Sequence, residues 1–288
     1  MLWLYLSIIA YFINAVVFVI DKYLLAAPIP KYRAYAFGVS VLSLGAVFLI
    51  PFGVSWYGLN YFLIAVSAGA SFFIGLIFLY RAIRESDISV AATQAGAMGA
   101  IFTYVFSIFI LKDVLPSLNS LAVILLISGI FLLGKVEKKV FFTAIIAGAL
   151  FGLYYVLLKL SFNQSDFING LFWTRVGFVG SAFLSLLWTG TREDIKLSYG
   201  NASNRSKLVF VGNKLLAGIG FIILYFAIRL GNVSLVNAML GFQFMFTFLL
   251  AFIFKDKLYG IKENLNRGVI IFKLAGIVSI LMGLILLY

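Results

Sequence analysis

Four amide side chains stand inside long apolar runs of this sequence, where each needs a hydrogen-bonding partner. Asn14 lies in the run 2–20, Gln94 in the run 88–111, and Asn237 and Gln243 in the run 233–254. Burying a polar group in an apolar medium costs free energy unless the group is hydrogen-bonded. These amides are therefore predicted either to contact a bound solute or to hydrogen-bond between helices, and the sequence leaves both interpretations open.

Two cationic side chains also lie inside apolar runs. Arg175 and Lys214 are about 10 Å, or two helical turns, from the nearest run ends. Either side chain can snorkel to the membrane interface. If it faces a cavity instead, it would attract a carboxylate or a phosphate. The second interpretation predicts an anionic or amphoteric ligand.

Aromatic side chains are a third group of candidates. Tyr104, Tyr154, Tyr155, Trp173 and Tyr225 could pack around an aromatic or quaternary-ammonium group. Because aromatic residues make up 17% of the chain, most of them are expected to face lipid or neighbouring helices.

The residue types that carry most catalytic chemistry are missing. The chain has no cysteine and no histidine, which excludes thiolate nucleophiles, imidazole metal sites and histidine acid–base catalysis. No paired carboxylates stand inside an apolar run. The sequence therefore predicts neither an enzyme nor a bound cofactor or metal.

Composition fixes the class of protein. Of the 288 residues, 64% are hydrophobic and 11% are charged, and the mean hydropathy is +1.11. Soluble domains average about 45–50% apolar and about 25% charged residues. The apolar residues form unbroken runs rather than alternating with polar ones, which favours helices over a barrel. We expect an all-α integral membrane protein whose solvent is the lipid bilayer.

Ten apolar runs are each near the length of a membrane span. The first is predicted to be a retained helix rather than a signal peptide. We expect residues 189–207 to form a solvated connector, and 258–270 to form either a short interfacial helix or a loop. The runs cover residues 2–20, 33–52, 60–80, 88–111, 117–134, 140–161, 168–188, 208–229, 233–254 and 269–288.

The chain contains an internal duplication. The stretch from Leu79 to Leu115 recurs from Leu224 to Leu258, and at a constant offset of 145 the Leu, Tyr, Ala-Ile-Arg and Ser at positions 79–89 match those at 224–234. At other offsets Lys22 matches Lys159 and Arg33 matches Arg175. Each half, 1–139 and 140–288, holds five runs, and an odd number reverses the direction in which the second half enters the membrane. This predicts two inverted five-helix repeats.

Charge gives an orientation. The loops after odd-numbered runs hold most of the 22 Lys and Arg residues. The positive-inside rule then places those loops in the cytoplasm and both termini outside. The same rule explains the net charge of +12, so we expect no nucleic-acid partner.

The repeated elements together resemble the drug/metabolite transporter superfamily, within its ten-helix EamA-like branch. The resemblance rests on Tyr80 and Tyr225 with the Ala-Ile that follows each, on Arg33 and Arg175, and on acidic residues closing the fourth and ninth runs. Those residues are Asp113 and Asp256, where the family usually has Gly-Glu. The resemblance implies a transporter of small organic solutes in a prokaryotic inner membrane. It also implies cytoplasmic termini, which conflicts with the charge count.

Three functional hypotheses follow. The first is a transporter of amino-acid-like or other amphoteric or anionic metabolites that works by alternating access. The second is a lipid or lipid-linked sugar flippase, which a lateral opening lined by Arg175 or Lys214 would favour. The third is a non-transporting scaffold subunit. All ten acidic residues are predicted at helix ends or in loops, which favours facilitated movement or exchange over proton antiport. A homodimer through the fifth and tenth runs stays open.

Overall fold

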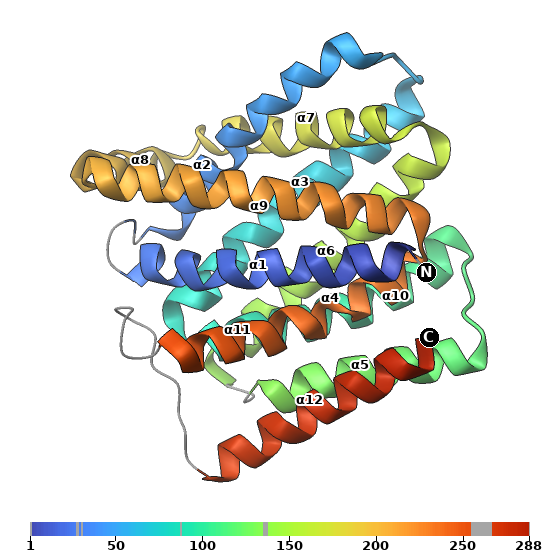
Figure 1. Cartoon of the computed structure of the whole chain (residues 1–288). Coiled ribbons are helices and arrows are strands. Elements are labelled where there is room, and N and C mark those ends of the chain that lie inside the picture. Colours follow the sequence, from blue (N-terminus) through green and yellow to red (C-terminus); the bar gives the residue numbers. More distant parts are fainter. Residues whose placement is uncertain are drawn as a thin grey trace.

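The protein consists of helices arranged side by side, with no strand in the part of the chain that the computed structural model describes (Figure 1). The description covers residues 2–26, 29, 31–86, 88–134, 138–254 and 267–287. The helices are α1 (Leu2–Ala26), α2 (Tyr32–Leu42), the 3₁₀ segment η1 (Ser43–Phe52), α3 (Leu59–Glu85), α4 (Ile88–Phe106), the π-helical segment η2 (Ser107–Leu111), α5 (Ser117–Leu133), α6 (Lys138–Gln164), α7 (Phe167–Ser185), α8 (Thr189–Asn201), α9 (Asn204–Leu230), α10 (Val233–Ala238), α11 (Leu240–Phe254) and α12 (Arg267–Leu287).

A helix lies at every one of the predicted apolar runs. Among the described residues, nine helical segments are long and apolar enough to cross a membrane, and the apolar α5 has 17 residues. The chain is therefore an all-α integral membrane protein, as composition predicts. The predicted alternatives for 258–270 fall largely on residues 255–266, which lie outside the described part, as does the linker at 135–137.

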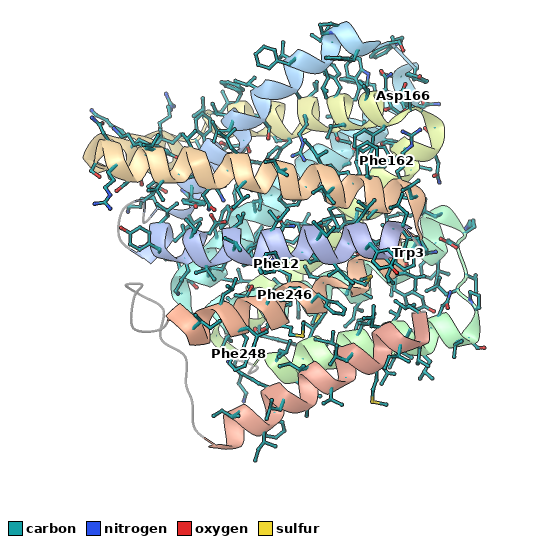
Figure 2. All side chains as sticks on the ribbon, in the orientation of Figure 1. Trp3, Phe12, Phe162, Asp166, Phe246 and Phe248 are labelled. Atoms are coloured by element: carbon teal, nitrogen blue, oxygen red, sulfur yellow. The ribbon has the colours of Figure 1, made fainter. Side chains whose placement is uncertain are left out.

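Two long helices occupy the middle of the bundle. α1 packs against α9 and α11, and α6 packs against α3 and α4, while α5 and α12 pair with each other at one side (Figure 1). Phe12 of α1 meets Phe246 of α11 edge to face, with ring centroids 5.2 Å apart (Figure 2). The α3–α7 contact needs glycine, because a Cβ on Gly69 would lie 2.1 Å from the Thr174 carbonyl oxygen. Small residues of this kind let membrane helices approach closely.

Two lysines cap the C-terminal ends of other helices by donating hydrogen bonds to their last carbonyl groups. Lys22 Nζ donates hydrogen bonds to the carbonyl oxygens of Ile83 and Ser86, at 3.3 and 3.1 Å, at the end of α3. Lys159 Nζ donates to the carbonyl oxygens of Ile228, Arg229 and Gly231, at 2.9 to 3.0 Å, at the end of α9. The last carbonyl groups of a helix have no partner within the helix, so each lysine satisfies groups that would otherwise be unpaired.

The segment predicted as a solvated connector, 189–207, is largely helical, which the sequence did not predict. Residues 189–201 form α8 and 204 begins α9. α8 packs against α2, where the Tyr199 hydroxyl donates to the Ala34 carbonyl oxygen at 3.1 Å. Gly38 leaves room for that ring, because a Cβ there would lie 1.9 Å from the Tyr199 hydroxyl oxygen. Burial raises the pKa of Tyr199, so its hydroxyl stays protonated as a donor.

The turn between α6 and α7 is built around Asp166 (Figure 2). Its carboxylate accepts hydrogen bonds from the Asn169 backbone N–H at 2.9 Å and from Asn169 Nδ2 at 2.6 Å, which is an N-cap of α7. Burial alone would raise the pKa of Asp166, but these hydrogen bonds, with one from the Tyr57 hydroxyl, outweigh it and lower the pKa. The cap fixes where α7 begins and thus the height of Arg175 in the bundle.

Candidate functional site

A cavity of about 520 Å³ lies in the middle of the bundle. α1, α3, α4, α6, α7, α9, α10 and α11 contribute to its walls, together with α2 and η1. A volume of this size falls within the ~300–1,000 Å³ of small-molecule pockets. Seven of the side chains singled out in the sequence line it, namely Asn14, Tyr155, Arg175, Lys214, Tyr225, Asn237 and Gln243.

Four other predicted site residues do not line this cavity. Gln94 is buried elsewhere in α4. The Tyr104 hydroxyl lies 3.2 Å from Ser120 Oγ, and Trp173 Nε1 donates to the Ser55 carbonyl oxygen at 3.0 Å. Tyr154 lies one layer behind the wall, whereas its neighbour Tyr155 lines the cavity.

Arg175 brings a positive charge to one end of the cavity. Its guanidinium donates a hydrogen bond to the Tyr225 hydroxyl and lies 5.2 to 5.8 Å from the ring centroids of Tyr225, Phe178 and Phe72. Such distances fit cation–π contacts. Within the described part of the chain no carboxylate lies within 4.0 Å of it. The Arg175 charge is thus held by hydroxyl and aromatic groups without being neutralised.

Tyr225 extends this group. Its hydroxyl oxygen accepts a second hydrogen bond, from the Tyr154 hydroxyl at 2.6 Å. A tyrosine oxygen has two lone pairs and one hydrogen. With both lone pairs engaged, the Tyr225 hydroxyl can still donate toward the cavity. Arg175 and Tyr225 together therefore present hydrogen-bond donors and one positive charge to any occupant.

The second charged group of the cavity is an ion pair, which corrects the prediction that every acidic residue lies at a helix end or in a loop and decides between the two interpretations of Lys214. Asp21 lies inside α1 rather than at its end, and is 3% exposed. Lys214 Nζ lies 2.5 and 2.7 Å from its two carboxylate oxygens, and the Tyr35 hydroxyl and Asn213 Nδ2 each donate to Oδ1 at 2.6 Å. Lys214 does not snorkel to the interface, and a carboxylate is embedded in the bundle after all.

The Asp21 position has a signal that sequence analysis missed. Asp21 follows Asn14 by seven residues, which places both side chains on one face of α1. Val17 and Phe18, between them on that face, line the cavity as well. The apolar run ended at the first charged residue, whereas α1 continues to Ala26. Helical periodicity across that charge would have identified Asp21.

Two amide oxygens in the cavity wall lack partners. Asn237 Nδ2 donates to Thr103 Oγ1 at 2.5 Å and to the Gly99 carbonyl oxygen at 3.3 Å, which ties α10 to α4. The side-chain oxygens of Asn237 and Asn14 are buried without a protein hydrogen bond. Buried polar atoms are normally satisfied, so these two oxygens are candidate acceptors that an occupant reaches only if the side chains move. Asn237 thus combines interhelical bonding with a free acceptor.

Across the described residues, no group of three histidine, cysteine or acidic side chains gathers within reach of one ion. The cavity instead offers hydrogen-bond donors, two acceptors and apolar walls, which suit binding of an organic solute.

Comparison with known proteins identifies the fold alone. No protein-family model matches the chain, and no curated protein matches it. A solved structure described as "Crystal structure of protein" is similar to it, with a TM-score of 0.65 and 14% sequence identity. The similarity covers 99% of this chain and 96% of the other. The arrangement of helices therefore recurs in another protein of nearly the same length.

Proposed function

We propose that this protein is a membrane transporter of small organic anions or amphoteric metabolites that works by alternating access. The observation that carries the proposal is Arg175, an unneutralised guanidinium in the wall of a central cavity within a membrane-spanning bundle. Charges inside a membrane protein are costly and commonly belong to a substrate pathway. The alternative of a scaffold subunit gives this cavity and this charge no role.

The moving parts are proposed to be two inverted five-helix repeats, residues 1–139 and 140–288. In support, α1 packs on α9 and α11 as α6 packs on α3 and α4, which is the relation expected when the first helix of each half contacts the third and fourth of the other. The matched Lys22 and Lys159 also close equivalent helices, α3 and α9. The cavity is lined from both halves, where transporters of inverted repeats bind substrate.

The charges favour a singly charged anion. Lys214 is neutralised by Asp21, so the described lining of the cavity carries about one net positive charge, on Arg175. Carboxylates and phosphates pair well with a guanidinium. The free oxygens of Asn14 and Asn237 could accept from an ammonium or hydroxyl of the same solute.

Embedded Asp21 removes the sequence argument against proton coupling. The sequence predicts no carboxylate within the membrane, whereas Asp21 is buried beside the cavity. Facilitated movement or exchange is retained as the simpler proposal, and the test below includes a proton gradient so that the two mechanisms give different results.

The test is counterflow in proteoliposomes. Vesicles that contain the purified protein are loaded with one unlabelled anion, diluted into the same labelled anion, and compared with empty vesicles across a panel of amino acids, carboxylates and phosphate esters. We expect protein-dependent accumulation of at least one anion without an imposed proton gradient. Accumulation only with the gradient would replace exchange by proton coupling. No accumulation across the panel under either condition would refute the transporter.

A further inference from the structure

The cavity opens sideways between η1 and α9. Some of its lining residues are also exposed on the outer surface, and they come from two helical segments that face each other across the opening. Leu215 is 65% and Ile219 is 54% exposed. Because these residues belong to an apolar span, we expect the part of their exposed surface that lies outside the cavity to meet lipid. The rim consists of Leu42, Gly45, Leu215, Gly218, Ile219 and Ile222.

The opening follows from the path of α2 and η1. Near its start, α2 contacts α9 through Tyr35 and Phe210, whose ring centroids are 5.0 Å apart. Beyond this contact η1 packs against α7, and the α2–η1 helix diverges from α9 (Figure 1). Added Cβ atoms on Gly45 and Gly218 would meet no atom within 4 Å. Each rim therefore has open space beside its glycine.

Apolar groups connect this opening to Arg175. Leu171, Phe178 and Phe221 line the same cavity, and Phe72 and Phe178 also flank the guanidinium. The described lining carries charge only at Arg175 and at the neutralised pair of Asp21 and Lys214, which lies about 16 Å from Tyr225 along α9. An occupant that reaches Arg175 from the opening thus meets apolar walls first and a positive charge at the end.

We infer that the ligand of this cavity is an amphiphile with a single anionic head group that enters from the bilayer. Its carboxylate or phosphate monoester would pair with Arg175 and Tyr225, and its apolar chain would lie along the aromatic wall and through the opening between η1 and α9. The inference rests on the proposed function in taking this ligand to be the transported solute, but its test measures binding. A water-borne amphiphile and a single-chain lipid of the leaflet share this chemistry.

A small hydrophilic anion fits these surroundings less well. Its hydration shell would be removed next to apolar walls, which costs free energy, and it has no apolar surface whose burial would offset that cost. Burying the alkyl chain of an amphiphile contributes about 0.8 kcal/mol of binding free energy per methylene. This corresponds to about a fourfold gain in affinity for each added methylene. Affinity should therefore rise steeply with chain length until the chain reaches the lipid, and should depend on the free space at the rim.

The experiment measures binding of labelled butyl, octyl and dodecyl phosphate to the protein in nanodiscs, with empty nanodiscs subtracted. Gly218→Phe and Gly45→Phe fill the two rims, and Gly212→Phe is the matched control, because Gly212 also lies on α9 with no atom within 4 Å of an added Cβ but does not line the cavity. We expect octyl phosphate to bind at least 100-fold more tightly than butyl phosphate. Both rim variants should weaken octyl phosphate binding at least 10-fold, and Gly212→Phe should leave it unchanged.

Equal binding of butyl and octyl phosphate, or equal effects of Gly218→Phe and Gly212→Phe, would overturn the inference. If Gly218→Phe does not fold, Gly45→Phe alone decides. A second arm follows movement of a fluorescent lysophosphatidate between leaflets: protein-dependent movement identifies a lipid as the source, and its absence with octyl phosphate binding retained identifies a water-borne amphiphile. Chain-length-dependent binding without any counterflow would refute the transport function and leave this inference standing.

Discussion

Replacing Arg175 with glutamine is expected to reduce anion counterflow about 10- to 100-fold while the protein stays folded. The glutamine keeps a hydrogen-bond donor near Tyr225 but removes the only unneutralised charge in the described lining of the cavity. Hydrogen bonds to charged groups contribute about 1.5–3 kcal/mol, which corresponds to that range of affinity. No carboxylate within the described residues loses a partner in the variant, so we expect little loss of stability.

The matched control is Arg33→Gln. Arg33 is the counterpart of Arg175 in the sequence repeat, but it lies at the start of α2 and does not line the cavity. Its variant should transport like the parent at equal protein content. Arg175→Lys should fall between the parent and Arg175→Gln, because it keeps the charge and loses the planar donor geometry. Parental counterflow in Arg175→Gln would exclude Arg175 from anion binding.

Breaking the ion pair between Asp21 and Lys214 is expected to lower the free energy of unfolding by about 3–5 kcal/mol. Both side chains are buried, at 3% and 8% exposure, so removing one leaves a charge in the bundle without its partner. Lys214→Met also leaves Tyr35 and Asn213 bonded to an uncompensated carboxylate. Neither Tyr35 nor Asn213 can replace the ammonium, because both are neutral.

Thermal stability in detergent checks this prediction, measured as the fraction of protein that stays monodisperse after heating. Lys214→Met and Asp21→Leu should each lower the midpoint strongly, and the double variant should recover most of the loss, because replacing both members of a buried pair is often nearly neutral. A double variant whose loss equals the sum of the single losses would show that the pair is not coupled.

The positions of the helices were predictable because uninterrupted apolar runs dictate them. The ends were not, since α1 continues through Asp21 once Lys214 neutralises its charge. α8 was missed because its sequence is polar, and its place depends on Tyr199 packing on α2 beside Gly38. The end of α1 and the position of α8 both depend on tertiary contacts, and the hydropathy of the local sequence carries no information about such contacts.

The sequence predicted which helices contribute to the candidate site, but only partly which face of each helix lines the cavity. Adjacent helical residues point about 100° apart, so Tyr155 lines the cavity while Tyr154 bonds to Tyr225 behind it. Trp173 and Arg175, two residues apart in α7, also have different surroundings. A membrane helix shows little contrast between its lipid face and its inner face, because both are apolar. The lateral opening is invisible in the sequence for the same reason.

The most direct test of the central claim asks whether a transported anion occupies the Arg175 cavity. The chain has no cysteine, so Ser43→Cys places a single and nearly isosteric thiol in the cavity lining, and Asn204→Cys places one at the exposed start of α9. We predict that the anion with the strongest counterflow slows modification of Ser43→Cys by a water-soluble thiosulfonate, leaves Asn204→Cys unaffected, and loses its effect when Arg175→Gln is added. Unchanged modification of Ser43→Cys at saturating anion would contradict the claim.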